Sequence, residues 1–182
     1  QQIADAGAPP ASSFARNALQ LGRLVAGDTR IRLAFVALGG WDTHVDQGGA
    51  SGWLANRLRP LGDGLAALAR GLGGAWRDTA VVVLSEFGRT VHENGDRGTD
   101  HGHGNAIWLA GGAVRGGRVY GDWPGLTPAA LYQRRDLAVT TDFRAALAAI
   151  LGQHMGLADR QLALVFPGAP AGGAGLGQLL AA

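Results

Sequence analysis

The sequence predicts an α/β fold in which a parallel-rich, doubly wound sheet carries helices on its faces. Three short runs of apolar residues, 31–38, 80–84 and 106–110, have the continuous apolar character of strands that are covered on both sides. A long helical pattern separates the first two runs, as a right-handed crossover between parallel strands requires. Helices and strands therefore follow one another in the order that is typical of the α/β class.

Two helices flank the first predicted strand. Apolar residues recur at helical spacing after Ser12 and Ser13, either of which can cap the helix, and Gly27 closes it. From Ser51 onward, leucines recur at alternating spacings of four and three residues, which predicts a helix with one apolar face against the sheet. Pro60 is expected to kink this helix or to begin its second half.

Two further helices are expected downstream of the third strand. Thr127-Pro128 opens a short helix, with proline at its first position. Thr140 or Thr141 caps a longer one, which Gly152 or Gly156 ends.

The length of 182 residues suits one domain with a real core, which we place at 12–168, with loosely ordered ends at 1–11 and 169–182. No apolar run approaches the roughly 20 residues of a membrane-spanning helix. The formal net charge is only +2 and the arginines are scattered, which argues against a nucleic-acid partner. The chain has no cysteine, which excludes disulfides, thiolate ligands and a cysteine nucleophile.

Side chains of the kinds that bind divalent metals follow two of the predicted strands. The first strand leads into G-G-W-D-T-H, and the second leads into a glycine-rich stretch, 85–105, that holds three of the chain's five histidines. Because the ends of strands are where α/β sheets place their ligands, these residues are expected to form a site. The candidate metal ligands are Asp42, His44, Glu86, Asp100, His101 and His103.

The acidic candidates each have an alternative structural role. Asp42 could form an Asx turn that leaves His44 solvated. Glu86 follows a strand that we expect to be buried, and a buried carboxylate is costly unless it is paired, so an ion pair with Arg89 is the alternative there. Asp100 could be a ligand, or it could accept a hydrogen bond from a ligating histidine.

His101, His103 and Arg89 are the remaining candidates. Two histidines in a glycine-rich loop suit metal binding or acid/base chemistry, and the alternative is a flexible loop hydrogen-bonded to backbone. The guanidinium of Arg89 suits phosphate, sulfate or carboxylate. We expect none of the nearby hydroxyl groups to be an activated nucleophile; they belong to Thr43, Ser85, Thr90 and Thr99.

Four motifs in this order resemble an uncharacterised bacterial family, the domain of unknown function 1501 family. They are G-G-W-D-T-H, S-E-F-G-R-T, D-H-G-H-G and G-G-A-V-R-G-G-R-V-Y-G, and the resemblance covers roughly residues 14–167. It implies membership of the alkaline phosphatase/sulfatase-like superfamily, with a metal site at the strand ends of a doubly wound sheet. It also implies export to the periplasm by the twin-arginine route.

The superfamily's ligand pattern carries over in part. One strand end supplies an aspartate and a histidine a few residues apart, which Asp42 and His44 resemble. The next strand supplies an Asp-His pair. Glu86 stands where that aspartate would be, and Phe87 stands in the place of the histidine, which is a departure from the pattern.

A later loop of the superfamily supplies one more histidine, a place that His101 or His103 fits, and Asp100 with His101 could instead replace the interrupted pair. The superfamily's first strand brings another aspartate and the nucleophile. Nothing before Phe14 could supply that strand, so the chain is expected to be the C-terminal portion of a larger domain.

The resemblance thus implies a metal-dependent hydrolase of small phosphate or sulfate esters that is incomplete without an upstream half. Zinc is the metal expected, with manganese or calcium as alternatives. Arg89 would hold the anion, and His103 would act as general acid or base. The alternative is a non-catalytic exported binding or assembly protein that retains the fold.

Overall fold

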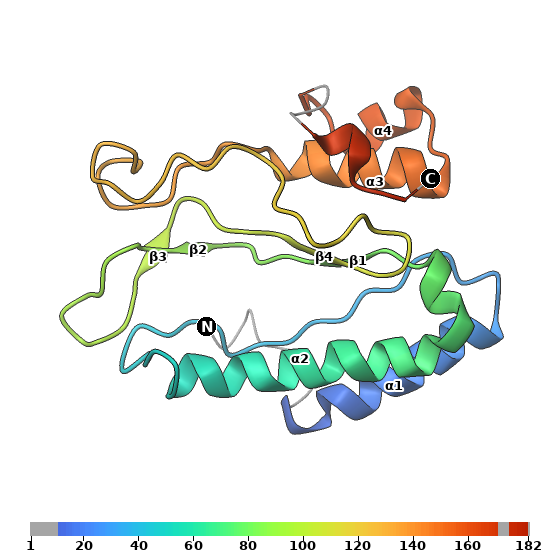
Figure 1. Ribbon diagram of the computed structural model, residues 1–182, viewed down its shortest axis with the longest axis horizontal. Helices are drawn as coiled ribbons and strands as arrows, with labels where there is room; N and C mark the ends of the chain where they lie inside the picture. The colour runs from blue at the N-terminus through green and yellow to red at the C-terminus, as the bar shows by residue number, and fades with distance from the viewer. Residues whose placement is uncertain (1–10, 171–174, 182) are drawn as a thin grey trace. The chain divides into compact units, whose positions relative to one another are not determined.

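The structure of the protein is a computed structural model that describes residues 11–170 and 175–181 (Figure 1). The expectation of a loosely ordered lead-in at 1–11 therefore lies outside the described residues, except for Ala11. None of the described helices is long and apolar enough to cross a membrane.

The chain divides into two compact units, and each is described by itself. Unit 1 contains residues 1–76 and 92–100, and unit 2 contains residues 77–91 and 101–182. The glycine-rich stretch that follows the second predicted strand is thus shared between the two units.

Unit 1 is built on two helices, α1 (Ala11–Gly27) and α2 (Trp53–Leu72), which lie side by side (Figure 1). Both were predicted from the spacing of their apolar residues, and both are confirmed. Pro60 lies inside α2, and Gly73 follows its last residue with a positive φ of 55°. A short 3₁₀ helix, η1 (Gly73–Asp78), continues the chain.

Glycine allows α1 and α2 to pack closely. A Cβ added to Gly22 would lie 2.6 Å from the carbonyl oxygen of Leu68, and one added to Gly64 would collide with the ring of Phe14. Phe14 and Leu61 are buried, so the apolar faces of the two helices form the core of this unit.

Residues 31–38 have no regular secondary structure, and their apolar side chains are exposed, with Leu33 at 77% and Phe35 at 91%. The prediction of a strand covered on both faces is therefore wrong for this segment. An apolar run indicates that a segment gains by burial, but a strand also needs a neighbour for its backbone groups. The doubly wound parallel sheet stays a prediction.

Unit 2 contains two antiparallel strand pairs, of which the first joins β1 (Val81–Val83) to β4 (Trp108–Ala110). The predicted strands 80–84 and 106–110 are thus confirmed as neighbours. Their carboxyl ends lie at opposite edges, however, and the expectation of a parallel arrangement is wrong for this pair. Apolar content indicates a strand but not its direction, and the connection between these two contains no crossover helix.

The second pair joins β2 (Gly88–Arg89) to β3 (His101–Gly102), with Gly88 opposite Gly102 and Arg89 opposite His101. A Cβ at Gly88 would collide with the carbonyl oxygen of Gly104, and one at Gly102 would lie 2.5 Å from the carbonyl carbon of Arg89. Glycine is needed at these positions because the backbones approach so closely.

The longest helix described in unit 2 is α3 (Phe143–Met155), and Asp142 caps it instead of one of the two preceding threonines. The Asp142 carboxylate accepts a hydrogen bond from the backbone N–H of Arg144 at 2.8 Å. Side-chain hydrogen bonds from Arg144 also hold the pKa of this carboxyl below its ordinary value. Gly156, one of the two glycines that the sequence offered as its end, closes the helix in the left-handed conformation.

Two further elements of unit 2 were not predicted, the helix α4 (Asp159–Val165) and the 3₁₀ helix η2 (Leu176–Gln178). The short helix expected at Thr127-Pro128 is a series of turns instead. Proline at a first helical position is also compatible with a turn, and the sequence signal does not separate the two.

The core of unit 2 includes the end of the chain. Leu176 and Leu179 are only 3% and 1% exposed, and they pack with Ile150 of α3. The expectation of a loose segment at 169–182 is therefore wrong for these residues. High glycine and alanine content weakens the local preference for structure, but two leucines suffice to bury the segment.

Candidate metal centre

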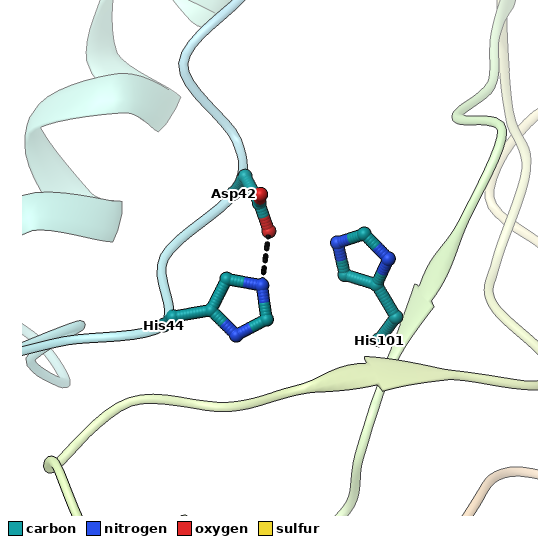
Figure 2. Close-up of side chains that lie close together, drawn as sticks. All are labelled: Asp42, His44 and His101. Atoms are coloured by element: carbon teal, nitrogen blue, oxygen red, sulfur yellow. Dashed lines mark ion pairs between the residues drawn. The ribbon is translucent and has the colours of Figure 1, made fainter. Parts of the chain in front are cut away.

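The imidazole of His44 lies between two carboxylates within unit 1. Its Nε2 is 2.9 Å from Oδ1 of Asp42, the ion pair that Figure 2 marks with a dashed line. Its Nδ1 is 3.0 Å from Oδ1 of Asp100, which lies 56 residues further along the chain. The sequence pointed to these three residues as candidate ligands, and the structure places them together as the Asp42–His44–Asp100 array.

Asn94 supports this array and was not among the residues that sequence analysis selected. Its side-chain oxygen accepts hydrogen bonds from the backbone N–H groups of Asp96 at 2.9 Å and Gly98 at 3.0 Å. Its side-chain nitrogen donates to the carbonyl oxygen of His44 at 3.0 Å and to Oδ1 of Asp100 at 3.1 Å. One amide thus ties the array to both chain segments that form it.

Gln47 makes a second connection between the same two segments. The hydroxyl groups of Thr43 and Thr99 both donate to its Oε1, each at 2.6 Å. Both threonines are buried, and the backbone N–H of Thr99 donates to the carbonyl oxygen of Thr43 at 3.1 Å. These two hydroxyls therefore help Gln47 to hold the two segments together.

Close backbone contact explains why glycine stands at position 98. A Cβ there would collide with the carbonyl oxygen of His44, so any other residue would push the two segments apart. Asp46 and Arg97 flank the contact with positive φ values of 47° and 58°, and their side chains form an ion pair at 2.6 Å. Such backbone conformations are uncommon outside glycine and cost free energy that the surrounding hydrogen bonds must offset.

Within unit 2, the ring of Phe87 contacts the side chains of both Arg89 and His101. The rings of Phe87 and His101 are stacked, with centroids 4.4 Å apart and planes 6° from parallel. The guanidinium carbon of Arg89 is 4.9 Å from the centroid of the Phe87 ring, within the range of a cation–π contact. The register of β2 with β3, which sets Arg89 opposite His101, brings these groups together.

His103 stacks on Tyr132, with ring centroids 4.0 Å apart and planes 16° from parallel. Stacking covers the face of an imidazole, whereas its nitrogens form bonds in the plane of the ring. The stacks of His101 and His103 are therefore compatible with hydrogen bonds or metal bonds at the ring nitrogens. Glu86 is exposed on the segment that follows β1, although the sequence predicted a buried position at the end of a strand.

The candidate residues thus fall into two groups. Asp42, His44 and Asp100 form a connected array in unit 1, and each of the first two can offer a ligand atom to a metal ion. The members in unit 2 are Glu86, Arg89, His101 and His103. His101, which projects from β3 (Figure 2), directly follows Asp100 in the chain.

Comparison with protein families adds one assignment. Residues 1–166 match the family described as "Protein of unknown function (DUF1501)", which accounts for most of the chain. The chain belongs to the DUF1501 family. This confirms the resemblance that its four motifs indicated, and the wider superfamily remains a prediction. No curated protein and no solved structure matches this DUF1501 chain.

Proposed function

We propose that this DUF1501 protein is a metal-dependent hydrolase-like protein that acts on small phosphate or sulfate esters and is related to the alkaline phosphatase/sulfatase superfamily. The observation that carries the proposal is the Asp42–His44–Asp100 array. It combines oxygen and nitrogen donors, which divalent metals use in hydrolytic sites.

The donor chemistry of the array fits a divalent metal. Asp42 and Nε2 of His44 would supply ligand atoms, while Asp100, whose Oδ1 lies 3.0 Å from Nδ1, would accept a hydrogen bond from the opposite ring nitrogen. Ligating histidines commonly make such a bond to a carboxylate, and it fixes the orientation of the ring. An imidazole donor favours zinc over calcium, which prefers oxygen ligands, and the carboxylate oxygens keep manganese as an alternative.

His101 is the next candidate ligand because of its position in the chain. Its Cα is only about 3.8 Å from that of Asp100, the spacing of consecutive residues. Glu86 and His103 stay candidates from the sequence alone.

A bound metal would polarise the ester oxygen and lower the pKa of a bound water or hydroxyl. The chain's own residues would bind and orient the substrate. The guanidinium of Arg89, supported by the Phe87 ring, would hold the phosphate or sulfate group. His103, stacked on Tyr132, would give or take a proton at a ring nitrogen.

Turnover of an aryl phosphate and an aryl sulfate, with and without added zinc or manganese, tests the proposal. Because the resemblance implies an upstream half, the assay should include the longest natural form of the protein. We expect metal-dependent turnover that Arg89→Gln reduces and that the matched change Arg160→Gln, on the exposed helix α4, leaves unchanged. Metal binding without turnover of either ester would instead favour a binding or assembly protein.

A further inference from the structure

Unit 2 contains a cavity that the proposed metal site does not use. Its volume is about 410 Å³, within the range of roughly 300–1,000 Å³ that small-molecule pockets occupy. Three parts of the chain line it: the segment 113–115, the last turn of α3, and the segment 177–181. All three belong to unit 2, so the cavity lies within a single compact unit.

The first wall of this cavity belongs to the motif G-G-A-V-R-G-G-R-V-Y-G at 111–121, to which the proposed metal site gives no role. Two backbone hydrogen bonds tie this wall to the end of the chain. The N–H of Arg115 donates to the carbonyl oxygen of Leu179 at 2.9 Å, and the N–H of Ala181 donates to that of Ala113 at 2.8 Å. The motif and the end of the chain therefore form one continuous surface.

Two side chains fasten the walls of the cavity further. The hydroxyl of Tyr120 bridges the carbonyl oxygens of Arg115 and Gln178, at 2.9 and 3.1 Å. Nε2 of Gln153, on α3, donates to the carbonyl oxygen of Leu176 at 3.3 Å. The walls are thus joined to one another without a ligand, and a ligand that enters the cavity has little ordering of the chain to offset.

The side chains that line the cavity carry positive charge. Its basic residues are Arg115 and His154, and among the described residues no aspartate or glutamate lines it. Neither basic side chain forms a hydrogen bond or an ion pair with another residue within 11–170 and 175–181, so their donors are available to a ligand. An arginine is always protonated, and its planar fork matches the two oxygens of one carboxylate.

We propose that this cavity binds a small organic acid in its ionised form, with the carboxylate on the guanidinium of Arg115. Leu180 and Ala181 supply apolar surface for a short hydrocarbon body, and the side-chain amides of Gln153 and Gln178 offer further donors. The inference does not rest on the proposed metal site. It adds a second binding site to the protein and gives the 111–121 motif a function.

Benzoate is a suitable probe because it joins a carboxylate to a compact apolar ring. We titrate it into ¹⁵N-labelled protein that has been stripped of metal, so that the carboxylate cannot bind through a metal ion. The expected result is a saturable change in the NMR shifts of the backbone N–H groups of Gly177 and Ala181, which line the cavity. Acetate, which lacks the ring, and benzyl alcohol, which lacks the charge, should each bind at least about 10-fold more weakly.

The variant Arg115→Gln removes the guanidinium and keeps the backbone hydrogen bonds of this position. Because Arg115 is exposed, the fold should persist, and benzoate should bind about 10-fold more weakly or worse, since a charge-assisted hydrogen bond is lost. The matched control is Arg118→Gln, which changes the net charge equally on an exposed arginine of the same motif outside the lining. It should bind benzoate as the unaltered protein does.

The variant Gly177→Leu tests the cavity itself. A Cβ at this position would meet nothing within 4 Å, so a larger side chain can be added without a clash at its first atom. The added side chain should fill the cavity and abolish benzoate binding although Arg115 is still present. Loss of binding in Arg115→Gln and Gly177→Leu, but not in Arg118→Gln, would support the proposal.

Three results would overturn it. The first is equal benzoate affinity in Arg115→Gln and in the unaltered protein. The second is an equal loss of affinity in Arg118→Gln, which would show attraction to net charge alone. The third is a titration in which the N–H groups of Gly177 and Ala181 do not shift.

Discussion

The imidazole of His101 lies flat against the ring of Phe87, with centroids 4.4 Å apart and planes 6° from parallel. Phe87 stands where the superfamily resemblance places a histidine. In this chain the phenylalanine ring stacks on His101 and offers no ligand atom to a metal. Replacing Phe87 should therefore change the orientation of His101 more than it changes the fold.

Replacing Phe87 with leucine should free the His101 ring, while Phe87→Tyr should retain the stack. The expected observation is an upfield ring-current shift of the His101 ring protons that persists in the tyrosine variant and disappears in the leucine variant. The loss of stability should be near the 0.5–1.5 kcal/mol or so that aromatic pairs contribute beyond burial. Identical His101 shifts in all three proteins would show that the stack does not exist in solution.

Replacing Gly22 with alanine should destabilise the contact between α1 and α2, because a Cβ there would lie 2.6 Å from the carbonyl oxygen of Leu68. Overpacking of this kind costs about 1–3 kcal/mol. Gly62→Ala is the matched control within α2, since a Cβ there meets nothing within 4 Å, and it should stabilise the helix by up to about 1 kcal/mol. Urea unfolding of the two variants should therefore give shifts of opposite sign.

Replacing Leu179 with alanine should lower the free energy of unfolding by about 2–5 kcal/mol, because the side chain is only 1% exposed. Leu164→Ala on α4, where the leucine is 82% exposed, should have little effect. Thermal or urea unfolding checks both. Equal, small effects would mean that the end of the chain does not pack into the core.

Loss of the Asp142 cap should destabilise α3 by about 1 kcal/mol at neutral pH. Arg144 lowers the pKa of Asp142 in the folded state from its ordinary value of 3.8, so the folded state favours the ionised form. The contribution of the Asp142 carboxylate to stability is therefore complete above the pKa of the unfolded state, and it is lost as the pH falls through the lower pKa of the folded state. The free energies of unfolding of the unaltered protein and of Asp142→Ala should differ at neutral pH and converge in strong acid. A difference that grows toward acid would contradict this role of Asp142.

The sequence predicted well the elements of the fold that depend on local sequence patterns. Repeated leucines and their spacing predicted α2, and glycines at positions 152 and 156 narrowed the end of α3 to two residues, of which Gly156 is the observed one. The direction of β1 against β4 and the exposure of 31–38 depend on which segments meet, and neither composition nor periodicity carries that information.

In the candidate site, too, residues with a local signal could be predicted and residues defined by their contacts could not. Asp42, His44 and Asp100 were identifiable because carboxylates and imidazoles next to predicted strand ends are unusual as packing residues. Asn94 was missed because asparagine in a glycine-rich loop is equally typical of a turn, and only its four hydrogen-bond partners reveal its role. Asparagine often accepts a hydrogen bond from the backbone N–H two residues on, as Asn94 does here from Asp96, and this tendency is a local signal that could have drawn notice to it.

The central claim is that His44 belongs to a metal centre, and calorimetric titration of zinc into the metal-stripped protein tests it most directly. We compare the unaltered protein with His44→Gln and with His154→Gln, which changes a histidine of α3 in the other unit. We expect a saturable zinc site that is weakened at least about 10-fold in His44→Gln and unchanged in His154→Gln. Equal zinc affinity in all three proteins, or no binding in any, would contradict it.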